Sequence, residues 1–282
     1  MSDNDIFDCM LSPHERRKTA KAWLRSEQRN ALERLRKDVV PVSPYREAVT
    51  LIAYTFPEDE REFDYIEFAI RYSWRCIGRL KTVVIADRET ETLRCFAESC
   101  SDVEIQIEST LKPGSVSAMS SDCIERLHKR FSTKYCLIVQ DDGFPLNSNL
   151  GDFLGKYDYI GAPTVRDVPA QYLVDIFRCA CLNGGFSLRS KSLCEEASKQ
   201  WKFFRKFVRV GSVAHAEDVF YTQTACLNPF YRFKFKWPSS KAARRFSMPD
   251  FDGVVDISGE RDKVFGAHGH TALWQLLPRP LI

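Results

Sequence analysis

Two adjacent carboxylates at the end of a short apolar run are the residues of this chain best suited to chemistry. Residues 135–139 read Tyr-Cys-Leu-Ile-Val, and Gln140, Asp141, Asp142 and a glycine follow directly. The run is too short for a helix and is closed by Gly, so it predicts a buried strand. Ligands of open α/β sheets collect at the carboxyl ends of strands, where carboxylates can hold a divalent cation together with substrate phosphates. The alternative is a plain turn, because Asp-Asp-Gly is favourable turn chemistry.

Four further motifs follow this strand in the chain. They are YDYIGAP at 157–163, NGGFSLR at 183–189, EDVF at 217–220 and FGAHG at 265–269. In that order they predict a short strand entering a Gly-Pro turn, a double glycine before a second short strand, an acid pair that opens an apolar helix, and a His between two glycines.

This succession resembles the GT-A class of nucleotide-sugar glycosyltransferases. It is most similar to a bacterial and viral domain family of unknown function with the motifs Q-x-D, DYIGAP, NGGFSLR, EDVF and FGxH, over roughly residues 48–270. The resemblance implies a Rossmann-type, mostly parallel sheet flanked by helices, a nucleotide-sugar donor (a UDP-sugar is expected) and a divalent cation, Mn²⁺ or Mg²⁺. Gln140 departs from the Asp-x-Asp pattern frequent in this class, which leaves the strength and the necessity of metal binding open.

By resemblance, Asp142 is the principal carboxylate ligand of the cation and His268 completes the metal site. Gln140 lies in the donor-binding group, and Asp141 binds the ribose or orients the loop. Glycines on both sides of His268 would let the backbone approach the diphosphate closely. The alternative for His268 is an ordinary loop histidine with satisfied hydrogen bonds.

Further contacts with the donor are expected at two strand ends and one turn. The residues concerned are Thr55, Asp87, Asn183, Gly184 and Gly185. Thr55 and Asp87 end the first two strands, where the nucleoside of such enzymes lies. The Asn-Gly-Gly sequence would shape the sugar and acceptor pocket, and it predicts a tight turn in either case.

The acid pair Glu217-Asp218 is the candidate catalytic group. Glycosyl transfer with inversion needs one carboxylate to take the acceptor proton while the nucleotide leaves from the opposite face of the sugar. Asp218 is the candidate base, and Glu217 would hydrogen-bond hydroxyls of the acceptor or donor. The alternative is negative charge favoured by the dipole at the start of a helix.

Strands and helices alternate in the first half of the chain, which predicts an α/β fold with a mostly parallel sheet. Strands are expected at 48–55, 81–86, 103–107 and 135–139, and helices at 60–77, 89–99 and 117–130. From about residue 157 the pattern changes to short strands and loops. A second half-domain is therefore expected to pack on the same sheet.

An N-terminal helical extension is expected before this domain. Ser12, Pro13 and Glu15 have the spacing of a capping box at the start of a helix over 13–38. The predicted division is an extension at 1–44 and a glycosyltransferase-like domain at 45–282. Its nucleotide-binding half covers about 45–145 and its acceptor half about 146–275.

Composition indicates a globular, cytoplasmic protein. No run approaches the ~18 apolar residues that span a membrane, and the acidic first residues lack a signal-peptide pattern. The ten cysteines show no repeated CxxC spacing, so they predict reduced thiols, and a zinc site is poorly supported.

Positive charge is concentrated in one part of the chain. Residues 199–245 hold eleven Lys or Arg and two acids, a net +9, so the rest of the chain carries −6 of the total of +3. Segments 201–209 and 231–237 alternate cations with aromatic residues. Such a surface suits nucleic acid, anionic lipid headgroups through peripheral membrane contact, or acidic glycans. The alternative is a pair of solvated strands with one packed face.

The leading interpretation is therefore a hexosyl- or pentosyltransferase, metal-assisted and inverting. Its acceptor would be a surface glycan or its precursor, or a modified base in DNA. The other interpretation is a non-catalytic nucleic-acid-binding protein on a degenerate glycosyltransferase fold. Release of sugar from a donor would distinguish the two.

Overall fold

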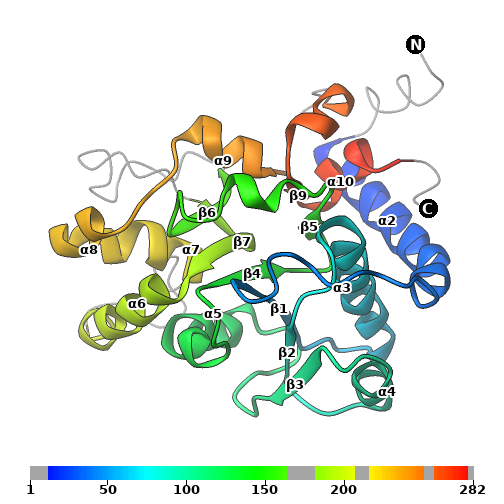
Figure 1. Ribbon diagram of the computed structural model, residues 1–282, viewed down its shortest axis with the longest axis horizontal. Coiled ribbons are helices and arrows are strands. Elements are labelled where there is room, and N and C mark those ends of the chain that lie inside the picture. Colours follow the sequence, from blue (N-terminus) through cyan, green and yellow to red (C-terminus); the bar gives the residue numbers. More distant parts are fainter. Residues whose placement is uncertain (1–11, 164–181, 207–215, 251–256, 279–282) are drawn as a thin grey trace.

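The chain folds around a six-stranded sheet with helices on both faces (Figure 1). The computed structural model describes residues 12–163, 182–206, 216–250 and 257–278. The strand order is β3-β2-β1-β4-β7-β6. The strands are β1 (Val49–Thr55), β2 (Thr82–Ala86), β3 (Val103–Ile107), β4 (Tyr135–Val139), β6 (Tyr159–Pro163) and β7 (Leu182–Ser190). This is the predicted mixed α/β fold, with β4 near the middle of the sheet and the second half of the chain on the same sheet.

The sheet is parallel from β3 through β4, and β7 runs against both of its neighbours. Every residue of β1, β2 and β4 is buried. Continuous apolar runs of this kind belong to parallel strands that are covered on both faces. The carboxyl ends of β1, β2 and β4 consequently meet at one edge of the sheet, and the predicted site residues follow these ends.

Alternate side chains of β1, β2 and β4 enter two separate hydrophobic clusters. In β4, Leu137 packs with the helices of one face and Ile138 with those of the other. The first face carries α2 (Pro13–Leu35), α3 (Phe63–Ile77), α4 (Glu91–Ser99) and α10 (His270–Leu276). The second carries α5 (Val116–Arg126), α6 (Lys191–Phe204), α7 (Glu217–Val219) and α8 (Pro229–Lys234).

Two details differ from the sequence prediction. The helix expected at 117–130 ends at Arg126 and continues only as a 3₁₀ turn, and residues 60–62 form a 3₁₀ turn before α3. The interpretation of 201–209 and 231–237 as alternating strands is wrong, because the described parts lie mainly in α6 and α8. Buried Leu193, Ala197 and Trp201 follow a helical spacing that the aromatic alternation obscured. Residues 207–209 lie outside the described residues.

A small second sheet joins the middle of the chain to its C-terminal part. Its order is β5-β9-β8, with β5 at Gly143–Pro145, β9 at Gly266–His268 and β8 at Ser247–Met248, directly after α9 (Ser240–Phe246). β5 begins immediately after Asp142, and Gly143 pairs with His268. This pairing brings two motifs from distant parts of the sequence together.

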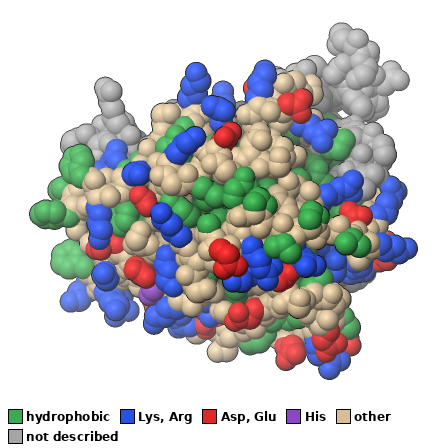
Figure 2. Space-filling view, in the orientation of Figure 1, with side chains coloured by type: hydrophobic (Ala, Val, Ile, Leu, Met, Phe, Trp, Pro, Cys, Tyr) green, Lys and Arg blue, Asp and Glu red, His purple; other side chains and the backbone are tan. Residues whose placement is uncertain are grey.

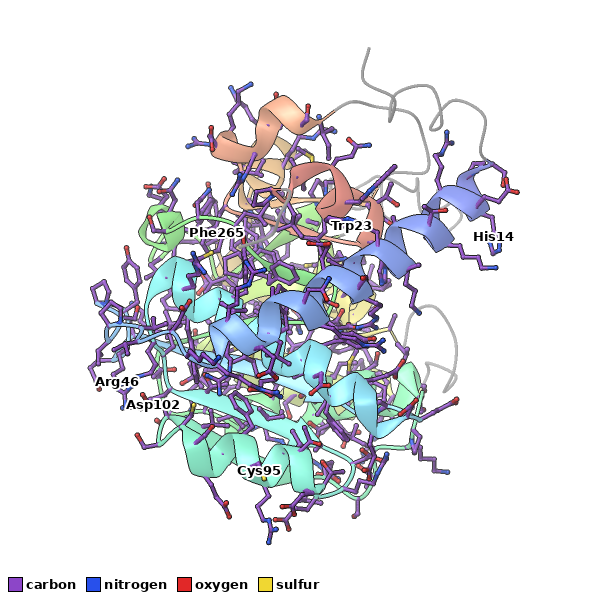
Figure 3. All side chains as sticks on the ribbon, turned by 90° about the vertical axis from the view of Figure 1, so that its right-hand side faces the viewer. His14, Trp23, Arg46, Cys95, Asp102 and Phe265 are labelled. Carbon is purple, nitrogen blue, oxygen red and sulfur yellow. The ribbon has the colours of Figure 1, made fainter. Side chains whose placement is uncertain are left out.

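The predicted N-terminal helix is present and is docked. Ser12 and Glu15 form the expected capping box at the start of α2. Leu24, Leu32 and Leu35 are buried in the hydrophobic cluster of the first face, and α2 packs against α3 and α10. Figure 3 shows α2 lying across the face turned to the viewer, with Trp23 in the region of α10. None of the helices in the described ranges is long and apolar enough to cross a membrane.

Candidate active site

The carboxylates after β4 lie in a tight turn. The backbone N–H of Gln140 donates to the carbonyl of Gly143 at 2.9 Å, and the N–H of Gly143 donates back at 3.1 Å. Asp141 and Asp142 occupy the tip, where both side chains are half-buried. The sequence offered a turn and a strand-end ligand site as alternatives, and the local geometry of the turn is compatible with both.

Asp142 is surrounded by the two histidines of a His-Gly-His sequence. Its Oδ1 lies 3.7 Å from Nε2 of His268, and its Oδ2 lies 3.2 Å from Nδ1 of His270. The N–H of Gly269 donates to the carbonyl of Asp142 at 2.7 Å, and Gly269 has a φ of 108°, which favours glycine. This backbone bond fixes the histidines on either side of the Asp142 carboxylate.

His270 was not predicted, although a second His two residues after His268 was the available signal. Burial lowers the pKa of His270, while the charges of Asp142 and Asp141 oppose that effect. The Nε2 atom of His270 is buried and has no hydrogen-bond partner among the described groups.

The described residues contain no group of three or more His, Cys, Asp and Glu side chains that could hold a metal ion. The imidazoles of His268 and His270 approach different oxygens of the Asp142 carboxylate. Each side of the carboxylate therefore offers a metal ion one carboxylate oxygen and one imidazole nitrogen. Mg²⁺ and similar hard cations are often held by one or two carboxylates, with substrate phosphates and water completing the shell. Asp142 and His268 fit such a partial site.

The double glycine connects this histidine cluster to the acid pair. A Cβ on Gly185 would lie 2.2 Å from Nε2 of His268 and 2.3 Å from Oε1 of Gln140, and these two atoms are 3.1 Å apart. A Cβ on Gly184 would lie 1.8 Å from Oε1 of Glu217. Only glycine allows the backbone to approach both groups this closely. Five predicted site residues from four motifs therefore meet here, namely Gln140, Gly184, Gly185, Glu217 and His268.

Asn183 shapes this turn from within. Its Oδ1 accepts a hydrogen bond from the N–H of Gly185 at 2.8 Å, which is the side-chain contact that turn-forming Asn residues make with their own backbone. Together Asn183, Gly184 and Gly185 form the tight turn that the sequence predicts.

Glu217 is held by a buried cation that was not predicted as a site residue. Nη2 of Arg189 donates to Oε1 of Glu217 at 3.1 Å and to the carbonyl of Gly184 at 3.2 Å. The Arg189 side chain is fully buried, with its guanidinium 4.9 Å and 4.7 Å from the ring centroids of Tyr159 and Tyr221. The positive charge of Arg189 thus lies in the strand of the NGGFSLR motif, whose residues next to Arg189 in sequence are apolar or small.

Asp218 has the perturbed acidity of a candidate proton acceptor. Burial, together with the negative charge of Glu217, raises the pKa of Asp218 to about 7. Its Oδ1 accepts a hydrogen bond from the N–H of Val219 at 2.7 Å. The acid pair lies in α7, which continues into a π-helical turn at Phe220–Thr224. Groups with a pKa near neutrality are suited to accepting and returning protons.

Thr55 and Asp87 lie at the same edge of the sheet, at the ends of β1 and β2. Both side chains are nearly inaccessible to solvent, and Arg88 contacts Oδ2 of Asp87 at 2.5 Å. Oδ1 of Asp87 is buried and lacks a hydrogen-bond partner among the described groups. Within the described parts of the chain, no hydrogen bond or ion pair joins these two residues to Asp142, so the structure places them on the predicted edge without bringing them into the cluster.

Helix α2 reaches the site from the N-terminal side. Arg25 donates a hydrogen bond to Oδ2 of Asp141, and Gln28 donates to the carbonyl of the same residue. The Arg25 guanidinium also lies 3.7 Å from the ring centroid of Tyr65 in α3. Neither contact had a signal in the sequence, because the partners are more than a hundred residues apart.

A separate pocket of about 580 Å³ lies at the other end of the sheet. It is lined by residues at the starts of β1, β2 and β3, such as Thr50, Thr82 and Val103, and by Arg46 and Asp102, which Figure 3 labels. It is therefore distinct from the cluster around Asp142.

Comparison with curated proteins gives no match. Among solved structures, the chain is similar to a mannosyltransferase, PcManGT from Pyrobaculum calidifontis, in complex with GDP-Man and Mn²⁺. The identity is 16% and the TM-score 0.37, over 65% of this chain and 58% of that one. The chain thus spans little more than half the length of that protein.

The profile of one protein family matches residues 114–268, a range that contains the Gln140 turn, the Asn183 turn, the acid pair and His268. The matched range is more than half of the 282 residues. The chain therefore belongs to the family described as protein of unknown function DUF5672.

Proposed function

We propose that this protein is a glycosyltransferase that moves a sugar from a nucleotide-sugar donor to a hydroxyl group. The observation that carries the proposal is the double glycine at 184–185, whose backbone touches both the Gln140–His268 pair and Glu217. The residues proposed to bind phosphate and the residues proposed for acid-base catalysis would then adjoin the same turn. A transfer reaction needs both functions next to one sugar.

On the donor side, Asp142 and His268 would hold a divalent cation, Mn²⁺ or Mg²⁺. The cation would supply positive charge to the diphosphate as the nucleotide leaves. Asp141 is oriented by Arg25, which supports a role in binding the ribose or in fixing the loop. The unpartnered oxygen of Asp87 supports a hydrogen bond to the nucleoside, next to Thr55.

On the acceptor side, Asp218 would take the proton from the attacking hydroxyl. Its raised pKa of about 7 makes it a stronger base than an ordinary carboxylate, and it becomes ionised as the pH rises through neutrality. The role of Glu217 as a hydrogen-bond acceptor for sugar hydroxyls also stays a proposal. Its negative charge already has one effect, since it raises the pKa of Asp218. Inversion follows from a single base acting on the face opposite the leaving group.

The acceptor would be a surface glycan, its precursor, or a modified base in DNA. Donor hydrolysis tests the reaction without knowledge of the acceptor, since transferases slowly transfer sugar to water. UDP-sugars or related donors, added together with Mn²⁺, should raise the melting temperature of the protein, because ligands that bind the native state stabilise it. The proposal fails if no nucleotide sugar stabilises the protein or is hydrolysed. Salt-sensitive DNA binding without sugar release would instead favour the non-catalytic alternative.

A further inference from the structure

Helix α8 presents two phenylalanines to solvent. The side chains of Phe230 and Phe233 are 87% and 81% exposed, far more than a packed aromatic residue. They are three positions apart, so they lie on the same face of the helix. Leu227, just before the helix, is 45% exposed, and Phe203 at the end of α6 is 59% exposed. Figure 2 shows hydrophobic side chains standing out at the left edge of the molecule, where Figure 1 places α8.

The helix that carries these rings is firmly attached. Tyr231 is buried, stacks edge-on against Phe235 and donates a hydrogen bond to the carbonyl of Tyr221 at 3.2 Å. The side chain of Asn228 caps the helix and contacts Gln200 in α6 at 3.1 Å. A mobile terminus often exposes aromatic residues, but here a fixed helix does so.

Cations surround the exposed rings. Residues 228–246 contain six Lys or Arg and no Asp or Glu. Exposed basic side chains lie at the end of α6 and in or just after α8; they are Lys202, Arg205, Lys206, Lys234 and Lys236. Glu196 of α6 forms an ion pair with Lys234 at 2.9 Å, so these two charges largely offset each other and the other basic residues supply the net positive charge. Figure 2 shows Lys and Arg side chains next to the hydrophobic ones at this edge.

We propose that α8 is a membrane-docking element, with Phe230 and Phe233 inserting between the headgroups of an anionic lipid bilayer. Apolar side chains on one face of a basic helix, projecting outward, are the pattern of interfacial binding. Basic residues close to the rings add attraction to the negative leaflet. Single-stranded nucleic acid is instead bound in a basic groove where bases stack on ring faces. Two rings at the tip of a projecting helix fit the lipid surface better. This inference does not depend on the proposed transfer reaction.

The test uses the full chain and sedimentation with vesicles. The protein should bind vesicles of phosphatidylcholine mixed with phosphatidylglycerol and remain in solution with phosphatidylcholine alone. Replacing both rings, Phe230→Ser with Phe233→Ser, should lower the partition coefficient by about tenfold or more, since burial of apolar area and charge attraction act together. The matched control replaces Val39→Ser and Val116→Ser, two exposed hydrophobic residues outside α8. It should bind as the parent protein does.

Insertion is measured separately from surface attraction. Brominated lipids should quench the fluorescence of the tryptophan introduced by Phe230→Trp. They should not quench the tryptophan introduced by Val39→Trp. Anisotropy of a labelled DNA is measured with the same variants. The proposal is overturned if anionic vesicles do not bind, if the double serine variant binds like its control, or if brominated lipid leaves the Phe230→Trp emission unchanged. Loss of DNA binding in the double serine variant, without vesicle binding in the parent, would assign the surface to nucleic acid.

Discussion

Arg25 of the N-terminal helix donates a hydrogen bond to Asp141, 116 positions later in the chain. The guanidinium is also stacked on Tyr65, which limits its freedom to leave that position. One residue of α2 thus restrains the loop that carries Asp142. The helix predicted as an extension consequently contributes to the geometry of the candidate site.

Replacing Arg25→Met should weaken donor binding by about tenfold, because a charged hydrogen bond contributes about 1.5–3 kcal/mol and its loss releases the Asp141 loop. Titration calorimetry with the nucleotide sugar measures this. Arg29→Met is the matched control, since Arg29 lies over the same Tyr65 ring at 5.3 Å, whereas Arg25 is the arginine that is hydrogen-bonded to Asp141. Equal losses in both variants would attribute the effect to packing on Tyr65.

Asp142→Asn should abolish stabilisation by donor and Mn²⁺ together while changing the melting temperature of the unliganded protein little. The half-buried carboxylate contributes little apolar packing, and an amide is a poor ligand for a hard cation. His268→Ala should weaken the same effect less. Thermal shift with and without Mn²⁺ gives both results, and an unaltered Mn²⁺ response in Asp142→Asn would refute the ligand assignment.

Asp218→Asn should lower kcat by about 10²–10⁴-fold with donor affinity nearly intact, because proton acceptance matters in the transition state. In the parent protein the rate should rise with pH through about 7, as Asp218 ionises. Steady-state kinetics over pH measures both. A pH profile that is flat through neutrality would contradict the role of Asp218 as base.

The same pKa predicts a dependence of stability on pH. The folded state holds the Asp218 proton more tightly than the unfolded state, so the free energy of unfolding should fall as pH rises from about 4 to about 7. Asp218→Asn has no charge to gain and should lack that part of the decline. Urea unfolding of both proteins across this range is the measurement, and parallel curves would mean that Asp218 titrates normally.

Gly185→Ala should eliminate activity and destabilise the fold by about 1–3 kcal/mol, because its methyl group would overlap His268 and Gln140. Gly259→Ala is the control, since a Cβ there meets nothing within 4 Å. Normal activity of Gly185→Ala would show that the turn has more room than the structure indicates.

Arg189→Met should cost about 3–5 kcal/mol of stability, because Glu217 would be left as a buried charge without its partner. Adding Glu217→Gln to that variant should recover part of the loss, since the uncompensated charge is then removed. Denaturant unfolding of the two variants gives the comparison. Further loss in the double variant would show that Glu217 is stabilised by something other than Arg189.

Sequence alone located the parts of the site that depend on local pattern. Three features depend only on neighbouring residues and could therefore be predicted. They are the strand before Asp141 and Asp142, the Asn183 turn and the capping box of α2. The roles of Arg25 and Arg189 could not be predicted, because tertiary packing decides which residues they contact. In the sequence, Arg189 is an unremarked residue of a predicted strand. Only the folded structure shows that it is buried and bound to Glu217. The helical state of α6 and α8 was hidden because alternating aromatic residues imitate a strand.

The pairing of β5 with β9 has a consequence for the order of events during synthesis. β1 to β4 leave the ribosome well before Gly269, whose N–H fixes the carbonyl of Asp142. A nascent chain can therefore complete four parallel strands while the carboxylate turn still lacks its histidines. Closing this contact links residues more than a hundred positions apart, which slows folding relative to local contacts. The candidate site around Asp142 is consequently complete only after residues 266–270 have been made and have added their strand.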